Sequence, residues 1–161
     1  NHEMQELNSN NKAITKKQVR LSCMNLLQKR IHELNEIERS AQESAAGDTK
    51  SSMGDKHETS RELLQQEREM AGRRMAEAIR QKEELERILP EHVLNQVQTG
   101  ALVETSIGTF FFATALGFIT LHEKKIAVLS IASPIGQALK EKQLGDIVSF
   151  QNKDIRIISI A

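Results

Sequence analysis

Few side chains in this sequence could do covalent chemistry. Cys23 is the one thiol, and it lies one residue before Met24 in a segment with helical periodicity, where neither a base partner nor a pocket is expected. His57 could be a metal ligand together with Glu58, but no second histidine follows at helical spacing, which argues against zinc. The sequence therefore predicts neither a thiol-dependent acyl-transfer enzyme nor a zinc centre.

Acidic side chains gather in a segment rich in glycine and serine. Asp48 and Asp55 lie inside it, and Glu58 follows Asp55 by about one helical turn. Aspartates in such segments commonly stabilise turns or cap helices, and Asp55 could cap a helix that begins there. Turn and cap roles explain both aspartates from residue types alone, so a ligand-binding role needs a further argument.

Two long helices must position this segment. Apolar residues recur at alternating steps of three and four over residues 15–46, and the same narrow stripe returns over residues 55–89. The stripes consist of Met24, Leu27, Ile31, Leu34, Ala41 and Ala45 in the first segment and Leu64, Ala71, Met75, Ala78, Leu85 and Leu89 in the second. Gly47 should end the first helix and Pro90 the second. The short tip loop, residues 47–55, makes the pair an antiparallel coiled-coil hairpin.

The rest of the chain changes to period-2 alternation and β-branched residues, which predicts a small α+β sheet domain. Strands are expected over residues 101–105, 109–114, 118–121, 126–131, 146–150 and 155–160, with hairpin turns at 122–125 and 151–154. A short helix fits residues 134–142, with Ser133 as its N-cap. Phe110 and Phe112 should lie on the opposite face of their strand from Phe111, so that one face is core and the other could contact a partner.

Composition bounds the remaining possibilities. The 161 residues suffice for one ordinary domain or two small ones, and 22 basic against 22 acidic side chains give no global field that would attract nucleic acid. A single cysteine excludes an intramolecular disulfide and fits a reducing, cytoplasmic setting. The polar N-terminus predicts a flexible arm, residues 1–13, rather than a signal peptide, and the most apolar stretch is too short to span a membrane. The predicted domains are this arm, the hairpin over 14–89 and the sheet domain over 90–161.

A constrained run in the sheet domain carries a family resemblance. Ser133, Pro134, Ile135 and Gly136 open the short helix, and Gly145-Asp146 enters the next strand. The serine can cap, the proline pre-sets the first helical turn, and a glycine can end the helix. This spacing resembles the signature of the C-terminal domain of Gre-type (GreA/GreB) factors, the bacterial family of transcription elongation and transcript-cleavage factors.

A second stretch resembles the hairpin tip of the same family. It begins at Gly47-Asp48-Thr49-Lys50 and continues with Glu58 and with Arg61-Glu62. The order of parts, with the hairpin first and the sheet second, also matches. Together the two stretches and the hairpin extend the resemblance over nearly all of residues 15–160.

The resemblance implies a fold and a mechanism. The sheet domain would have an FKBP-like fold and would dock, through its signature residues, on the outer rim of the secondary channel of RNA polymerase. The hairpin would reach down the channel during DNA-templated elongation. Tip carboxylates would help to hold a Mg²⁺ ion and a water there, because Mg²⁺ prefers oxygen ligands, and the polymerase would cleave the backtracked nascent RNA. The candidate tip residues are Asp48, Asp55 and Glu58, with support from Lys50 and Ser51.

Such a factor would not be an enzyme itself, because it lends ligands to the active site of the polymerase. The resemblance accordingly implies no cofactor and no stably bound metal of its own, no small-molecule substrate and no membrane partner. A prolyl isomerase activity, which an FKBP-like fold could suggest, is not expected. Such sites are lined with aromatic residues, and the chain has no Tyr and no Trp.

The tip departs from the family pattern at one position. The family has two acidic residues about one turn apart; Asp48 matches the first, and the second falls at Ser51, which cannot replace a carboxylate as a charged ligand. This tip also carries about two more residues than the family pattern, through Met53 and Gly54, and Asp55 or Glu58 could supply the second carboxylate if the longer loop re-aims it. The alternative is a regulator that occupies the channel without cleaving RNA. A third interpretation, a coiled-coil adaptor unrelated to transcription, is disfavoured by the signature in the sheet domain.

Overall fold

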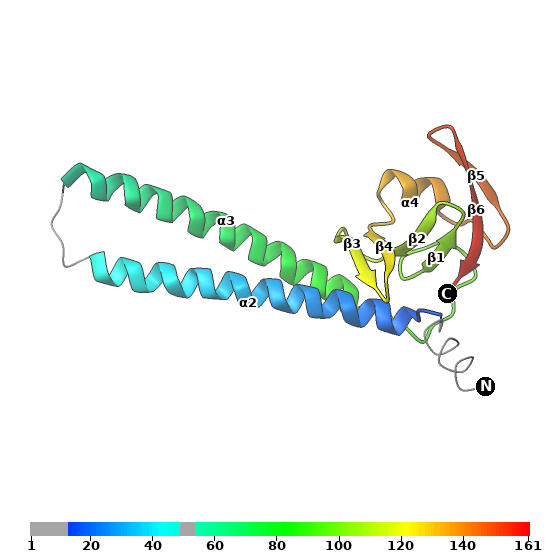
Figure 1. The fold of residues 1–161 in the computed structure, drawn as a ribbon, viewed down its shortest axis with the longest axis horizontal. Helices are drawn as coiled ribbons and strands as arrows, with labels where there is room; N and C mark the ends of the chain where they lie inside the picture. The colour runs from blue at the N-terminus through cyan, green and yellow to red at the C-terminus, as the bar shows by residue number, and fades with distance from the viewer. Residues whose placement is uncertain (1–12, 49–53) are drawn as a thin grey trace. The chain divides into compact units, whose positions relative to one another are not determined.

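A computed structural model describes residues 13–48 and 54–161, and within these ranges the side chains of residues 45–48 and 54–57 are not described. The predicted arm, apart from residue 13, and most of the tip loop therefore lie outside the described residues. The architecture is α+β, with two long helices followed by a six-stranded sheet and one short helix, as the sequence predicts (Figure 1). No helix in the described part of the chain is both long enough and apolar enough to cross a membrane.

The chain forms two compact units. The hairpin unit is Met24–Glu84. The sheet unit contains the described residues up to Cys23 together with Leu85–Ala161. The base of the hairpin therefore belongs to the same unit as the sheet.

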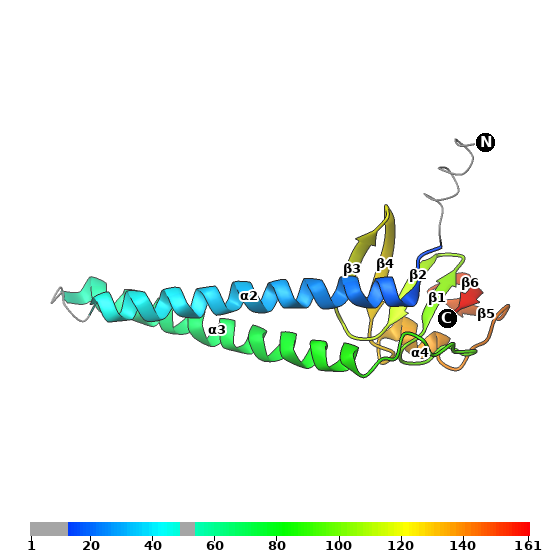
Figure 2. The ribbon, with the colours of Figure 1, turned by 90° about the horizontal axis from the view of Figure 1, so that it is seen from below.

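The hairpin consists of α2 (Lys16–Asp48) and α3 (Gly54–Glu86), each 33 residues long. Within the hairpin unit the two helices run side by side in opposite directions (Figures 1 and 2). Good helix formers such as Glu, Gln, Arg, Leu and Ala dominate both segments, and neither contains proline. The helix ends differ slightly from the expectation. α2 includes Gly47 and ends one residue beyond it, because a glycine in the last turn can still adopt helical angles.

A capping box begins α2. The Thr15 hydroxyl accepts a hydrogen bond from the Gln18 amide at 3.2 Å, and the Gln18 side-chain oxygen accepts one from the Thr15 amide at 3.0 Å. Each side chain thus satisfies a backbone donor that the first turn of a helix leaves without an intrahelical partner.

The predicted seam of the hairpin is confirmed in most positions. Its buried members are Leu27, Ala41, Ala71, Ala78 and Leu85, and its half-buried members are Met24, Ile31, Leu34, Leu64 and Met75. Leu89 is exposed, contrary to the prediction, because α3 ends at Glu86, before the turn that precedes Pro90. Ile88 is buried in its place.

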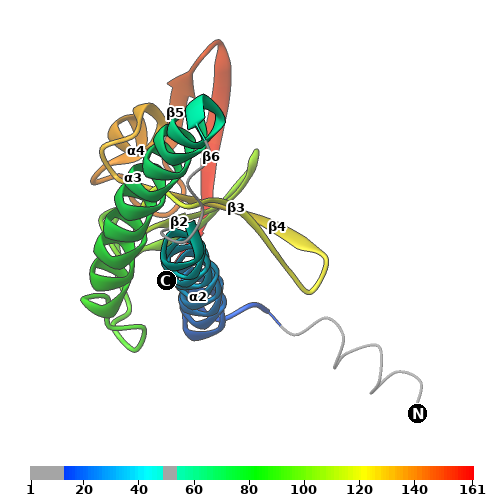
Figure 3. The same cartoon turned by 90° about the vertical axis from the view of Figure 1, so that its left-hand side faces the viewer.

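The six strands are β1 (Leu102–Thr105), β2 (Gly108–Phe112), β3 (Gly117–Leu121), β4 (Lys124–Leu129), β5 (Ile147–Phe150) and β6 (Lys153–Ile160). They are ordered β3-β4-β2-β1-β6-β5 in one sheet. β2 and β4 pair in parallel, and the other neighbours pair antiparallel. β3 and β4 extend as a two-stranded ribbon (Figure 3).

The short helix α4 (Pro134–Leu139) packs its apolar side chains into the core on one face of the sheet. Ile135 and Leu139 from the helix join a buried cluster that includes Phe112 from β2. Phe110 stacks on Phe112, with ring centroids 5.9 Å apart.

Both faces of β2 are buried, which differs from the expectation that one face might be left for a partner. Phe111 and Phe112 point to opposite faces, and both are fully buried. The exposed phenylalanine is Phe118 on the edge strand β3. Its side chain is 67% exposed, with the Lys125 ammonium 4.0 Å from its ring centroid.

Two tight hairpins occur where the sequence places turns. His122 and Glu123 join β3 to β4, and Gln151 and Asn152 join β5 to β6. All four residues have positive φ, between 49° and 64°. Such turns match the twist of the paired strands, but they normally use glycine or asparagine. Of these four residues only Asn152 is of that kind, so the other three adopt a conformation that is uncommon for their side chains.

Candidate functional site

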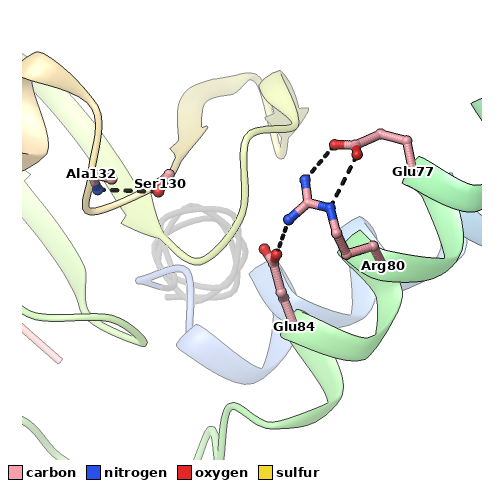
Figure 4. Close-up of polar contacts among 5 residues, drawn as sticks. All are labelled: Glu77, Arg80, Glu84, Ser130 and Ala132. Carbon is pink, nitrogen blue, oxygen red and sulfur yellow. Dashed lines mark hydrogen bonds and ion pairs between the residues drawn. The ribbon is translucent and has the colours of Figure 1, made fainter.

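The run Ser133–Asp146 forms a tightly determined element between β4 and β5. Ser130 stabilises the turn that precedes this element, because its hydroxyl accepts a hydrogen bond from the Ala132 amide at 3.1 Å (Figure 4). The Ser130 carbonyl accepts another from the Ser133 amide at 3.0 Å. Ser133 then caps α4, because its hydroxyl accepts a hydrogen bond from the Gly136 amide at 3.2 Å, and Pro134 occupies the first turn as predicted.

Gly136 is required by a close backbone approach. A Cβ atom built on this residue would lie 2.4 Å from the Ile131 carbonyl oxygen and 2.7 Å from its carbonyl carbon. That oxygen also accepts a hydrogen bond from the Gln137 side chain at 2.9 Å, which fixes the loop against the helix. The glycine in the signature is therefore explained by packing rather than by a left-handed backbone.

The Gly145-Asp146 pair forms the turn into β5. Gly145 has φ of +85°, a conformation that favours glycine. Its amide donates to the Ile157 carbonyl at 2.9 Å, and the Asp146 carbonyl accepts from the Ile157 amide at 3.0 Å. The Asp146 carboxylate accepts from the Gln143 amide at 2.8 Å. Both signature residues are thus occupied in holding the turn.

The surface of this element presents apolar side chains that sequence reasoning missed. Leu144 and Ile147 flank the Gly145-Asp146 turn, and their side chains are 66% and 65% exposed. Pro134 at the start of α4 is exposed as well. The sequence signal for this exposed apolar surface was the presence of two large aliphatic residues immediately beside a turn. The period-2 pattern instead assigned Ile147 to an ordinary strand position.

The acidic tip candidates are placed only in part. Asp48 is the last residue of α2, and Asp55 is the second residue of α3, but their side chains are not described. Lys50 and Ser51 lie outside the described residues altogether, whereas Glu58 is exposed on α3. Among the described side chains, no group of three or more histidines, cysteines or carboxylates could hold a metal ion.

Ion pairs organise the surface of the hairpin unit. Arg80 contacts Glu77 at 2.5 Å and also pairs with Glu84 (Figure 4). Arg68 and Glu38 pair across the two helices at 2.8 Å. The hydrogen bond from Arg68 holds the pKa of the Glu38 carboxyl below its ordinary value, and the one from Arg80 does the same for the pKa of Glu77.

The base of the hairpin is buried in the sheet unit. The Lys16 ammonium donates to the His92 carbonyl at 2.5 Å, and burial lowers its pKa. The Arg20 guanidinium donates to the Leu85 carbonyl at 2.9 Å, near the end of α3. Cys23 is fully buried, and this burial raises the pKa of its thiol to about 12. The thiol therefore stays protonated at neutral pH, which is the opposite of what a nucleophilic cysteine needs.

No family model matches the chain, and no curated protein matches it. Among solved structures, one described as "Structure of the transcription factor Gfh1" aligns with 88% of this chain and 92% of its own, with 21% identity and a TM-score of 0.33. A likeness at that level does not carry a functional argument.

Proposed function

We propose that this protein binds RNA polymerase at its secondary channel and inserts the hairpin tip toward the active site, where it promotes cleavage of backtracked nascent RNA. The observation that carries the proposal is the run from Ser133 to Asp146. Its sequence resembles the Gre signature, and each constrained residue in it has a structural use in the fold.

The dimensions of the hairpin suit this role. Each helix has 33 residues, which at about 1.5 Å per residue gives an arm of roughly 50 Å. Such an arm can carry a few side chains from a docking site at the surface of a large enzyme to a buried reaction centre. The sheet unit would supply the docking surface, with Leu144 and Ile147 beside the signature as apolar contacts.

The chemistry would be the two-metal phosphoryl transfer of the polymerase itself. Asp48, with Asp55 or Glu58, would donate oxygen ligands to a Mg²⁺ ion shared with the polymerase active site, and that ion would activate a water. The protein would then need no cofactor of its own and would not be an enzyme in isolation.

A second candidate function is a channel regulator that does not cleave. The observation in its favour is Ser51, which stands where the family has its second tip carboxylate. A tip with one carboxylate could still occupy the channel and compete with other ligands that enter it.

A cleavage assay separates the two candidates. A stalled, backtracked elongation complex of the cognate polymerase with end-labelled RNA is mixed with the protein or with its Asp48→Asn variant. Mg²⁺-dependent shortening of the RNA that the variant loses is the result that the lead proposal predicts. Asp154→Asn, in the sheet unit, is the matched control and should cleave normally.

The other outcomes are equally clear. Tight polymerase binding without RNA shortening would select the non-cleaving regulator. Absence of binding to the polymerase would contradict both candidates.

A further inference from the structure

A groove with an apolar floor runs between the two helices inside the hairpin unit. Its floor is formed by Leu34, Ile37 and Ala78, and its volume is about 540 Å³. Ile37 also lines a second hollow of about 290 Å³ between the same helices, together with Ala41. Ile37 keeps 45% of its surface exposed. The narrow seam of a two-helix hairpin thus leaves apolar surface that a third element could cover.

The apolar surface continues along α3 beyond the groove. Leu63 and Met70 are 57% and 44% exposed. They stand fourteen and seven residues before Glu77, which lines the groove, and heptad spacing places all three on the same face of the helix. The exposed side chains therefore form one stripe rather than isolated surface residues.

The charge at this groove is positive and only partly compensated. Three arginines line it, and none of their side chains has a hydrogen bond or an ion pair with any described residue: Arg30, Arg73 and Arg74. Of the two carboxylates in the lining, Glu77 pairs with Arg80, which also pairs with Glu84, and Glu33 has no ion pair among the described residues. The three arginines therefore outnumber the two carboxylates of the lining and give the groove a net positive charge.

The geometry points to a docking site for an acidic amphipathic helix of a partner protein. Such a helix would lay its apolar stripe over Leu34, Ile37 and Ala78 and would present its carboxylates to the three arginines. A helix in a groove buries its apolar face at i, i+3, i+4 and i+7 positions, and guanidinium groups bind carboxylates through paired hydrogen bonds. This inference goes beyond the proposed function, because the flank of the hairpin carries it and neither the tip nor RNA cleavage is needed.

Two other occupants fit the groove less well. The lining contains no aromatic side chain on which the bases of a single-stranded nucleic acid could stack. A second copy of the chain bound through a two-fold axis would set the three arginines against the same three arginines, which would repel.

The test uses the full chain and a labelled synthetic peptide as the probe. The peptide is about three heptads long, with leucine at the apolar positions and glutamate at the flanking positions. Binding is followed by fluorescence anisotropy. The glutamate peptide should bind, and a sister peptide with lysine at the flanking positions should not.

Charge reversal in the groove sharpens the test. Arg30→Glu and Arg74→Glu should each weaken binding about tenfold or more, because each removes a charge-assisted contact and adds repulsion. Arg61→Glu is the matched control, since Arg61 is an exposed arginine of α3 that lines neither hollow, and it should bind normally. Circular dichroism of each variant verifies that the helices are intact.

Several results would overturn the inference. If the groove variants bound the glutamate peptide as tightly as the parent protein, the arginines would not form the binding site. The same would follow if the lysine peptide bound as tightly as the glutamate peptide. Arginine-dependent binding of a single-stranded RNA oligonucleotide, with no binding of the glutamate peptide, would assign the groove to nucleic acid. A dimer in sedimentation that Ile37→Asp dissolves would assign it to a second copy. Because the assay contains no polymerase, its failure would leave the proposed function untouched.

Discussion

The sheet unit and the hairpin unit differ in how closely other atoms surround their backbones. In the sheet unit, Gly136 lies against the Ile131 carbonyl so closely that no side chain fits. In the hairpin unit, a Cβ atom added to Gly72 would meet nothing within 4 Å. The sheet unit is a closely packed core, whereas the hairpin is a pair of helices whose single apolar seam leaves much of each surface open. The sheet unit should therefore be sensitive to added volume where its backbone approaches closely, as at Gly136, whereas the exposed surface of the hairpin should tolerate it.

The largest expected effect concerns Cys23, at the buried base of the hairpin. Because burial raises the pKa of the thiol from 9.0 to about 12, the thiolate fraction at pH 8 should fall by about a thousandfold relative to an exposed cysteine. Alkylation by iodoacetamide should therefore be very slow in the native protein and rapid in urea. Equal alkylation rates in the native protein and in urea would show that Cys23 is not buried at the base of the hairpin.

The same burial gives stability a pH dependence. A pKa that is raised in the folded state favours the protonated thiol, so its contribution is fully present below the ordinary value of 9.0 and is lost as pH rises toward about 12. Denaturant unfolding over that range should show the loss, and Cys23→Ala should show less of it.

The next largest effect concerns Gly136. Gly136→Ala should lower the free energy of unfolding by about 3 kcal/mol, because the new methyl group must displace backbone rather than a flexible side chain. Urea unfolding followed by circular dichroism measures this. If the variant unfolds at the same urea concentration as the parent, Gly136 does not lie as close to the Ile131 carbonyl as described.

The matched glycine in the hairpin should respond in the opposite direction. Gly72→Ala should raise the free energy of unfolding by about 1 kcal/mol, because alanine is the better helix former and the added methyl group meets open space. The same urea experiment gives the result. A destabilised variant would mean that α3 approaches another element closely at this position.

The smallest effect concerns the ion pair of Glu38 with Arg68. The pKa of Glu38 is lowered in the folded state, chiefly by the hydrogen bond from Arg68, so the pair stabilises above the ordinary pKa of 4.5 and less as pH falls through the folded value. Glu38→Gln should lower the melting temperature slightly at pH 7 and not in high salt. Glu67→Gln, a carboxylate that has no ion pair among the described residues, is the control.

Much of the fold could be predicted because its elements have clear local patterns. Heptad spacing located both long helices to within about three residues, as helix boundaries generally allow. Period-2 alternation located all six strands. The parallel pairing of β2 with β4 was not predicted, because strand order depends on contacts between distant segments rather than on periodicity.

The candidate sites, like the elements of the fold, were predictable only where local sequence determines them. The cap at Ser133 and the proline of the first turn were predictable because both carry their constraints in the local sequence. The end of the short helix was predicted wrongly, since α4 ends at Leu139 rather than near Gly145, and the close approach of Gly136 to the Ile131 carbonyl was not predicted. The arginines of the hairpin groove come from two helices more than forty residues apart, and only the register of those helices brings them to one groove. The burial of both faces of β2 likewise depends on what packs against each face, which alternation cannot reveal.

Hydroxyl-radical cleavage can show whether the hairpin tip reaches the polymerase active site. Fe²⁺ can replace the active-site Mg²⁺ of the polymerase, and the hydroxyl radicals that it generates cut only nearby backbone. With the end-labelled protein bound, cuts should appear between Asp48 and Glu58 and not in the sheet unit. Binding without cuts at the tip, or with cuts confined to Leu85–Ala161, would contradict the account.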